Sequence, residues 1–138
     1  MKKTFLSVLI VVLVLGIGFV WGSAGISVQS MPPVVVKTMP QAGTVDVDPG
    51  LKEIRVTFSK EMKTKENWSV VIVSRETFPK ITGSIHYLPD KKTVIVPVTL
   101  EPGRTYAVWL NSKKWNYFQD VNHNPAVPYL LVFETKSN

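Results

Sequence analysis

The sequence predicts an all-β protein, an antiparallel β-sandwich of about seven strands. Short runs rich in β-branched and aromatic residues recur from residue 34 onward, at a spacing of roughly ten residues. Proline, glycine, asparagine and aspartate separate these runs, and no run repeats its apolar residues with a convincing helical period. Without long helices the chain cannot build the crossovers of an α/β fold. A small β-barrel would show the same pattern and stays open as the alternative.

The first half of this region holds four predicted strands, at residues 34–39, 53–59, 68–74 and 81–88. The clearest alternation is in the second of them, where Ile54, Val56 and Phe58 are apolar and their neighbours are polar. This period of two predicts a strand with one buried face. Residues 60–67, which follow it, could hold one helical turn.

The second half holds three more predicted strands, at residues 93–100, 104–110 and 127–135. Alternate residues of the first are apolar and share one face: Val94, Val96, Val98 and Leu100. Pro97 lies on the opposite face and has no N–H to donate, which predicts that this strand lies at a sheet edge or carries a bulge. In the other two strands the same alternation directs four side chains to the core: Tyr106, Val108, Leu110 and Phe133.

An apolar leader precedes the predicted domain. Lys2 and Lys3 come before an apolar run at residues 5–20, and small residues follow it. Residues 1–24 are therefore predicted to be a signal peptide cleaved after Ala24, because Gly22-x-Ala24 fits the small-x-small rule of signal peptidase. The alternative is a membrane anchor that is retained.

A retained anchor would cross the membrane through residues 5–21, because a spanning helix needs roughly 17–25 residues. In both cases the remainder is exported, to the medium or to the cell surface. Residues 25–33 are small, polar and proline-terminated and predict a linker, and residues 34–138 predict one domain. Because the chain ends soon after the last predicted strand, we expect this domain to act without a second one.

Composition excludes several classes of partner and site. The chain has no cysteine, which excludes disulfides, thiolate metal sites and lipid attachment through an N-terminal cysteine. The formal net charge is +6, of which Lys2 and Lys3 in the leader account for two. The remaining excess is modest and scattered, whereas a nucleic-acid surface would show a basic stripe interleaved with aromatic residues. No nucleic-acid partner is expected.

Four motifs resemble bacterial immunoglobulin-like domains of the S-layer-protein type. They are "KTMPQAGTVDVDP" (37–49), "IRVTFSKEM" (54–62), "LEPGRTYAVWL" (100–110) and "FQDVNHNPAVPYLLVFET" (118–135). Each motif alone is turn chemistry plus alternation, but their order makes the resemblance specific over residues 34–135. The resemblance implies an immunoglobulin-like sandwich that serves as a structural spacer or adhesion module on exported bacterial proteins. It implies no catalytic residues.

The stretch "FQDVNHNP" raises the question of a calcium site, because Asp120, Asn122 and Asn124 alternate like EF-hand ligands. An EF-hand loop needs glycine at its sixth position and glutamate at its twelfth, where this chain has Pro125 and Leu131. An EF-hand is therefore excluded, whereas a looser site on Asp120 with backbone carbonyls stays open. No metal or cofactor is expected.

The same stretch is better interpreted as a structural turn made by Asp120, His123 and Asn124. The family resemblance places His123 where glycine is usual. A left-handed residue at that position would then be carried by histidine, which tolerates a positive φ less well than glycine.

An aromatic loop supplies the candidate binding surface. Trp109, Trp115, Tyr117 and Phe118 fall close together and, with Asn116, could contact a polysaccharide of the cell wall or outside the cell, or a protein partner. Asn111 and Lys114 would add polar contacts. The alternative is that Tyr117 and Phe118 fold beneath the loop and close the end of the sandwich.

Catalysis has little support in the sequence. Ser84 and His86 share one strand face, but no carboxylate or nucleophile-elbow pattern accompanies them. The sequence therefore predicts a non-enzymatic exported module with a structural or adhesive role at the bacterial cell surface. The alternative function is a carbohydrate-binding module that acts through Trp115 and Tyr117.

Overall fold

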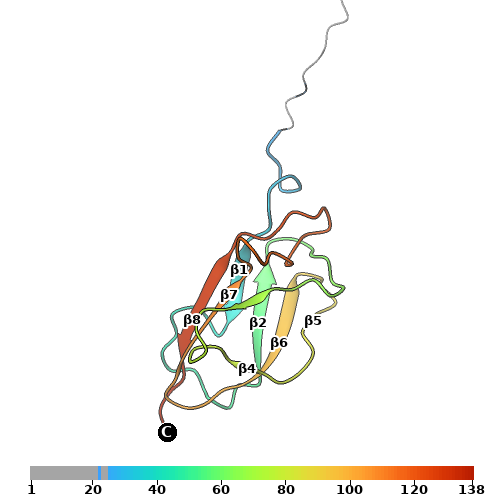
Figure 1. Cartoon of the computed structure of the whole chain (residues 1–138). Coiled ribbons are helices and arrows are strands. Elements are labelled where there is room, and N and C mark those ends of the chain that lie inside the picture. The colour runs from blue at the N-terminus through green and yellow to red at the C-terminus, as the bar shows by residue number, and fades with distance from the viewer. Residues whose placement is uncertain (1–21, 23–24) are drawn as a thin grey trace, which may run out of the picture.

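The computed structural model describes residue 22 and residues 25–138, and all of the regular structure there is β-strand (Figure 1). The strands are β1 (Val35–Met39), β2 (Glu53–Phe58), β3 (Val70–Ile72), β4 (Lys80–Ile81), β5 (His86–Tyr87), β6 (Thr93–Thr99), β7 (Thr105–Leu110) and β8 (Tyr129–Glu134). The described part of the chain contains no helix that is long and apolar enough to cross a membrane. The predicted leader helix lies outside the described residues.

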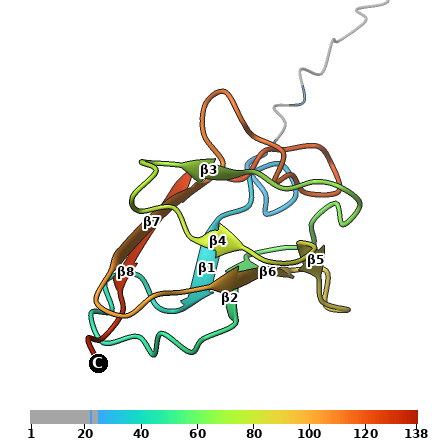
Figure 2. The ribbon, with the colours of Figure 1, turned by 60° about the horizontal axis from the view of Figure 1, so that its bottom comes forward.

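Two sheets face each other across the core (Figure 2). One has the order β1-β2-β6-β4, with β5 also pairing with β6, and the other has the order β3-β7-β8. Every pair of these strands is antiparallel. The predicted all-β sandwich is thus confirmed, and because the described sheets share no strand, the alternative of a closed barrel is wrong.

The core forms where the alternating side chains of the two sheets meet. β2 contributes Val56 and β6 contributes Val94 from one sheet, and β8 contributes Leu131 from the other; each is essentially inaccessible. Aromatic rings fill the ends of the core, with Tyr106 stacked on Phe133 at 5.5 Å between ring centres. The predicted inward faces of the strands at residues 53–59, 93–100, 104–110 and 127–135 are therefore those that pack.

Pro97 explains the largest difference from the predicted strands. The carbonyl of Pro97 accepts a hydrogen bond from the Thr82 N–H, so residue 97 directs its backbone groups toward β4 and β5. It has no N–H to continue a ladder on that side. Gly83 lies against the proline ring, where an added Cβ would come within 3.2 Å of it. The predicted strand at residues 81–88 is consequently broken into β4 and β5.

The predicted sheet edge at β6 is wrong, because β6 lies between β2 on one side and the pair β4 and β5 on the other. Proline is accepted inside the sheet because the neighbouring strand is interrupted opposite it. The predicted helical turn within residues 60–67 is also wrong. Met62 is buried there, and its N–H donates to the Lys91 carbonyl, so the segment is drawn along the sheet instead of coiling.

The two edges of the three-stranded sheet differ. Residues 43–47 run beside β8, where the Val47 N–H donates to the Glu134 carbonyl and the Glu134 N–H donates to the Thr44 carbonyl. These bonds cover the edge of β8. β3 is the opposite edge of the same sheet.

The first prediction concerns a hydrogen bond at the corner before β7. The buried Tyr106 hydroxyl accepts a hydrogen bond from the Glu101 N–H at 2.7 Å, and its ring packs in the core. Tyr106→Phe keeps the ring and removes the acceptor, so the free energy of unfolding should fall by about 0.5–1.5 kcal/mol in urea denaturation. Tyr129→Phe is the matched control, because the described residues give its hydroxyl no hydrogen bond. Equal losses in both variants would contradict the prediction.

Candidate functional site

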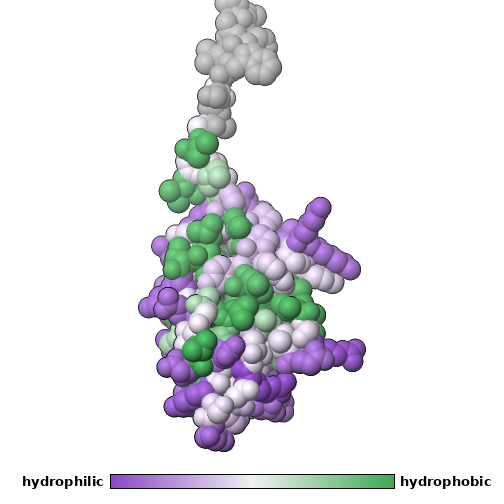
Figure 3. Space-filling model, turned by 90° about the vertical axis from the view of Figure 1, so that its left-hand side faces the viewer, coloured by the Kyte–Doolittle hydropathy of each residue, from purple (hydrophilic) through white to green (hydrophobic). Residues whose placement is uncertain are grey.

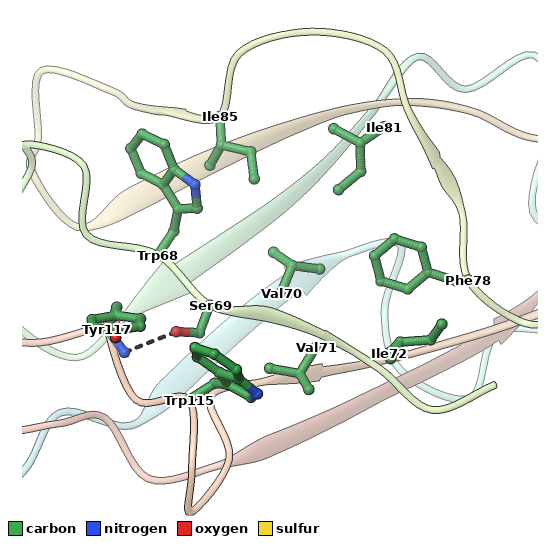
Figure 4. Close-up of a pocket in the computed structure, with 10 residues that line it drawn as sticks. All are labelled: Trp68, Ser69, Val70, Val71, Ile72, Phe78, Ile81, Ile85, Trp115 and Tyr117. Carbon is green, nitrogen blue, oxygen red and sulfur yellow. Dashed lines mark hydrogen bonds between the residues drawn. The ribbon is translucent and has the colours of Figure 1, made fainter. Parts of the chain in front are cut away.

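An open groove of about 570 Å³ runs along the edge where β3 faces β4 and β5 (Figure 4). Its long walls are apolar and consist of Val70, Ile72, Phe78, Ile81 and Ile85. Three aromatic residues gather at one end: Trp68, Trp115 and Tyr117. We call this feature the apolar groove.

Two of the predicted binding residues meet at the end of the apolar groove. Trp115 and Tyr117 are 46% and 48% exposed, and their ring centres lie 6.3 Å apart with planes tilted by 44°. The Lys114 ammonium lies 5.3 Å from the centre of the Trp115 ring. These rings therefore form a bent aromatic surface with a cation beside it, and not one flat platform.

Trp109 lies elsewhere, on the outer face of the three-stranded sheet. It stands in register between Val71 of β3 and Leu130 of β8, and these three side chains form a row across the sheet. Apolar residues also gather over the middle of the domain when it is seen from the side that β8 occupies in Figure 1 (Figure 3). Trp109 thus belongs to a sheet face and does not line the groove.

Phe118 and Asn111 are not available to a ligand, which corrects the predicted site. Phe118 is wholly buried and packs against Phe58 at 5.2 Å between ring centres. Asn111 is also wholly buried: its side-chain amide donates to the Phe118 and Ala126 carbonyls, and its side-chain oxygen accepts from the Phe118 N–H. Asn116 is half-buried, and its carbonyl accepts a hydrogen bond from Gln119.

Asn111 fixes the conformation of the aromatic loop. It follows directly on β7 with a φ of 62°, a conformation that asparagine tolerates better than most residues. The turn that follows is closed by the Ser112 N–H donating to the Trp115 carbonyl, and the Tyr117 N–H donates to the buried Ser69 hydroxyl beside β3. The loop is thereby held against the edge of β3. In the sequence, the only indication that Asn111 shapes the loop is its position directly after the predicted strand at residues 104–110.

Asp120 organises the predicted turn. One carboxylate oxygen accepts hydrogen bonds from the N–H groups of Asn122 and Asn124, each at 2.9 Å. The other oxygen accepts from the Asn124 side-chain amide at 3.0 Å and lies 2.6 Å from the Lys60 ammonium. His123 has a φ of 66° and its Nδ1 lies 3.2 Å from the Lys63 ammonium.

The Asp120 carboxylate is therefore fully engaged by protein donors. A cation bound there would have to displace Lys60, and the described residues contain no group of three or more acidic or histidine side chains arranged to hold a metal. A calcium site on Asp120 would also place two cations beside one carboxylate, which repel each other.

Lys60 also holds the N-terminal segment. Its ammonium lies within hydrogen-bonding distance of the carbonyls of Val28, Gln29 and Met31, at 2.9, 3.2 and 2.5 Å. The Lys60 side chain is only 14% exposed. The predicted linker is thus attached to the domain at the Asp120 turn, a contact that no periodicity in the sequence indicated.

The environment of Asp120 sets its protonation. Burial acts to raise the pKa of this carboxyl, but the hydrogen bonds from Lys60, Asn124 and Asn122 together lower the pKa below its usual value. The charged form is consequently the one that the fold stabilises.

Ser84 and His86 do not form a catalytic pair. Both are exposed, and the ring of His86 contacts the backbone carbonyl of Ser84 and not its hydroxyl. A nucleophile needs the base at its hydroxyl, so this arrangement does not support the hydrolase alternative.

A family model described as a bacterial Ig-like domain matches residues 29–135. The chain belongs to this family. The resemblance predicted from the four sequence motifs is therefore confirmed, and the Ig-like domain comprises all eight described strands.

Two solved structures resemble the Ig-like domain, and both are of S-layer proteins. A structure of the surface layer protein SbsC, domains 1–6, is 20% identical with a TM-score of 0.49, and covers 78% of this chain. A crystal structure of the S-layer protein rSbsC(31-844) is 21% identical with a TM-score of 0.48, and covers 77%. The chain spans only 14% of the length of each of these proteins. No curated protein matches the chain.

The second prediction concerns the pH dependence of stability. Because the pKa of Asp120 is lowered in the folded state, its contribution is complete above the unfolded pKa of about 3.9 and is lost as the pH falls through the folded pKa. Asp120→Asn should lower the melting temperature at pH 7 and flatten its fall below about pH 4. Differential scanning calorimetry across this range measures both effects.

Asp46→Asn is the control for this prediction, because Asp46 is exposed and the described residues give its side chain no hydrogen bond. The fall below pH 4 persists in part in Asp120→Asn, because the pKa of Asp90 is also lowered, first by the Thr93 hydroxyl and then by nearby backbone N–H groups. A melting temperature that calcium raises in the native chain, and no longer raises in Asp120→Ala, would overturn the structural interpretation.

The third prediction concerns the left-handed residue of the turn. Glycine adopts the φ of 66° found at His123 without the cost that a side chain imposes, but it also makes the unfolded chain more flexible. His123→Gly should therefore be neutral or stabilising, by at most about 1 kcal/mol in chemical denaturation. Asn122→Gly, at a neighbouring position without a positive φ, should destabilise the domain. A loss in His123→Gly as large as in Asn122→Gly would contradict this reasoning.

Proposed function

We propose that this chain is an exported, non-enzymatic Ig-like module with a structural or adhesive role at the bacterial cell surface, where its apolar groove contacts another protein. In this proposal residues 1–24 direct export, either as a cleaved signal peptide or as a retained anchor. Residues 25–33 link this segment to the domain at residues 34–138.

The observation that carries the proposal is how the polar and apolar side chains are used. The polar side chains of Asn111, Asp120 and Lys60 form hydrogen bonds or an ion pair within the domain and so stabilise its loops. The apolar groove is open, and two of its aromatic residues are about half exposed. A surface of this kind favours binding over chemistry.

The carbohydrate-binding alternative has weaker support. Trp115 and Tyr117 are close enough for one ligand to touch both, but their planes are tilted by 44°. A sugar chain would also need polar groups to pair with its hydroxyls, whereas the long walls of the groove are aliphatic and phenyl side chains. A protein segment with apolar side chains is the better match.

Export is tested by fractionating bacterial cells that produce the full chain. We expect the domain in the medium, or on the cell surface where protease added to intact cells removes it. A matched variant with Leu13→Arg and Leu15→Arg interrupts the apolar run and should keep the domain inside the cell. A native chain that stays in the cytoplasm would contradict the proposal.

The fourth prediction separates the two kinds of ligand. In native gels that contain cell-wall or extracellular polysaccharide, the mobility of the native chain and of Trp115→Ala should be equally unaffected. Retardation of the native chain that Trp115→Ala abolishes would establish the carbohydrate-binding function instead. Trp109→Ala, on the outer sheet face, is the control for a nonspecific effect of losing an exposed indole.

A further inference from the structure

We infer that β3 and the apolar groove bind an extended segment of a partner polypeptide, which adds to the edge of β3 as an antiparallel or parallel strand. Its inward side chains would be apolar and its outward side chains acidic. This inference rests on the proposed interaction role and specifies the chemistry of the partner.

The backbone of β3 provides the first support. The Ser69 carbonyl accepts a hydrogen bond from the Asn111 N–H, and bonding residues alternate along an antiparallel pair. The backbone N–H and C=O groups of Ser69 and Val71 therefore point toward β7, whereas those of Val70 and Ile72 point away from it. The described residues supply no hydrogen-bond partner for these outward groups. β3 thus presents a free edge on which a further strand can pair.

The edge is also unprotected. Exposed strand edges in soluble proteins are normally blunted by charged residues, by proline or by a covering segment. The edge of β8 has such a cover in residues 43–47, but the run from Val70 to Val73 holds only β-branched apolar residues. Ile72 and Val73 are 51% and 49% exposed. An exposed apolar edge of this kind can pair with a strand of another chain, either in a specific complex or in aggregation.

The apolar groove supplies the side-chain contacts. Val70 and Ile72 turn their side chains toward the other sheet, and Ile81 and Ile85 face them across the gap (Figure 4). An added strand would lie about 4.8 Å from β3 in the plane of its sheet. Every second side chain would then enter the gap between the sheets and cover these four residues, which predicts a partner sequence that alternates with a period of two.

Charge decides between a second copy and a different partner. The segments that flank the groove, residues 73–80 and 111–117, carry four basic residues and one acid: Arg75, Lys80, Lys113, Lys114 and Glu76. All five are exposed. Two copies meeting at this edge would bring two positively charged rims together, whereas acidic outward side chains on a partner would be attracted. The structure therefore favours an acidic partner segment over self-pairing.

The test uses nuclear magnetic resonance on the full chain, with a short synthetic peptide that alternates valine with glutamate as the probe. In the free chain the amide protons of Val70 and Ile72 should exchange with solvent rapidly, because nothing bonds them. With peptide at about ten times its Kd, their exchange should slow roughly tenfold, while the exchange of Val71 changes little. Unchanged exchange at millimolar peptide would overturn the inference.

Three matched comparisons sharpen this test. A peptide with N-methylated backbone amides keeps its side chains and should fail to protect Val70 and Ile72; equal binding would show a side-chain contact only and overturn strand addition. A peptide that alternates valine with lysine should bind more weakly. Ile72→Lys should abolish the protection, whereas Leu130→Lys, an exposed apolar position on the outer face of the same sheet, should leave it intact.

The same samples distinguish three outcomes: pairing between two copies of this chain, failure of the inference, and failure of the proposed function. Protection of Val70 and Ile72 that grows with protein concentration in the absence of peptide would show that a second copy occupies the edge, and would overturn the inference. A chain that is exported but binds no peptide removes the inference and leaves the surface role standing. A chain that binds the peptide but is never exported would contradict the proposed surface role and leave the inference about β3 standing.

Discussion

The ion pair between Lys60 and Asp120 is the interaction on which one end of this sandwich depends. It joins three segments: the linker, the residues after β2 and the turn before β8. The last two segments are also paired through their backbones, by the bridge between Met62 and Asp120 and by the Lys63 N–H, which donates to the Gln119 carbonyl. A buried charge must be paired, and removing one member of such a pair typically costs about 3–5 kcal/mol. Lys60 therefore fixes the carbonyls of the linker, and Asp120 fixes the N–H groups of its own turn.

Other polar side chains act in the same way wherever the ladders stop. The Asp90 carboxylate accepts hydrogen bonds from the Lys92 and Thr93 N–H groups at the turn before β6. The Thr135 hydroxyl donates to the Glu101 carbonyl at the opposite end. A domain without cysteine has no covalent staple, so these bonds and the core must hold the turns.

The sequence predicted what depends on alternation and missed what depends on contacts across the fold. Inward faces follow from a period of two along one strand, so Val56 and Phe133 could be placed without a structure. The break at Gly83 could not, because it is imposed by Pro97 on the neighbouring strand. Likewise the loop has no period, and which of Tyr117 and Phe118 is buried is decided by Asn111, whose side chain bonds both backbone groups of Phe118. Phe118 is thus the residue that closes the core, as the alternative prediction for this loop had it, whereas Tyr117 stays about half exposed.

The linker and the C-terminal residues leave the domain at opposite ends of the sandwich, with the linker at the end held by Lys60 (Figure 1). β3, which lines the apolar groove, lies on the side of the domain opposite β2 and β6 (Figure 2). A domain attached to a surface through its N-terminal segment would therefore turn the linker end toward that surface and keep the groove free along its flank. If the linker moved freely relative to the domain, the side of the domain that carries the groove could lie against that surface as often as away from it. The contact of Lys60 with three linker carbonyls restricts that movement, so in such an attached domain the residue that pairs with Asp120 would also help to hold the edge of β3 away from the surface.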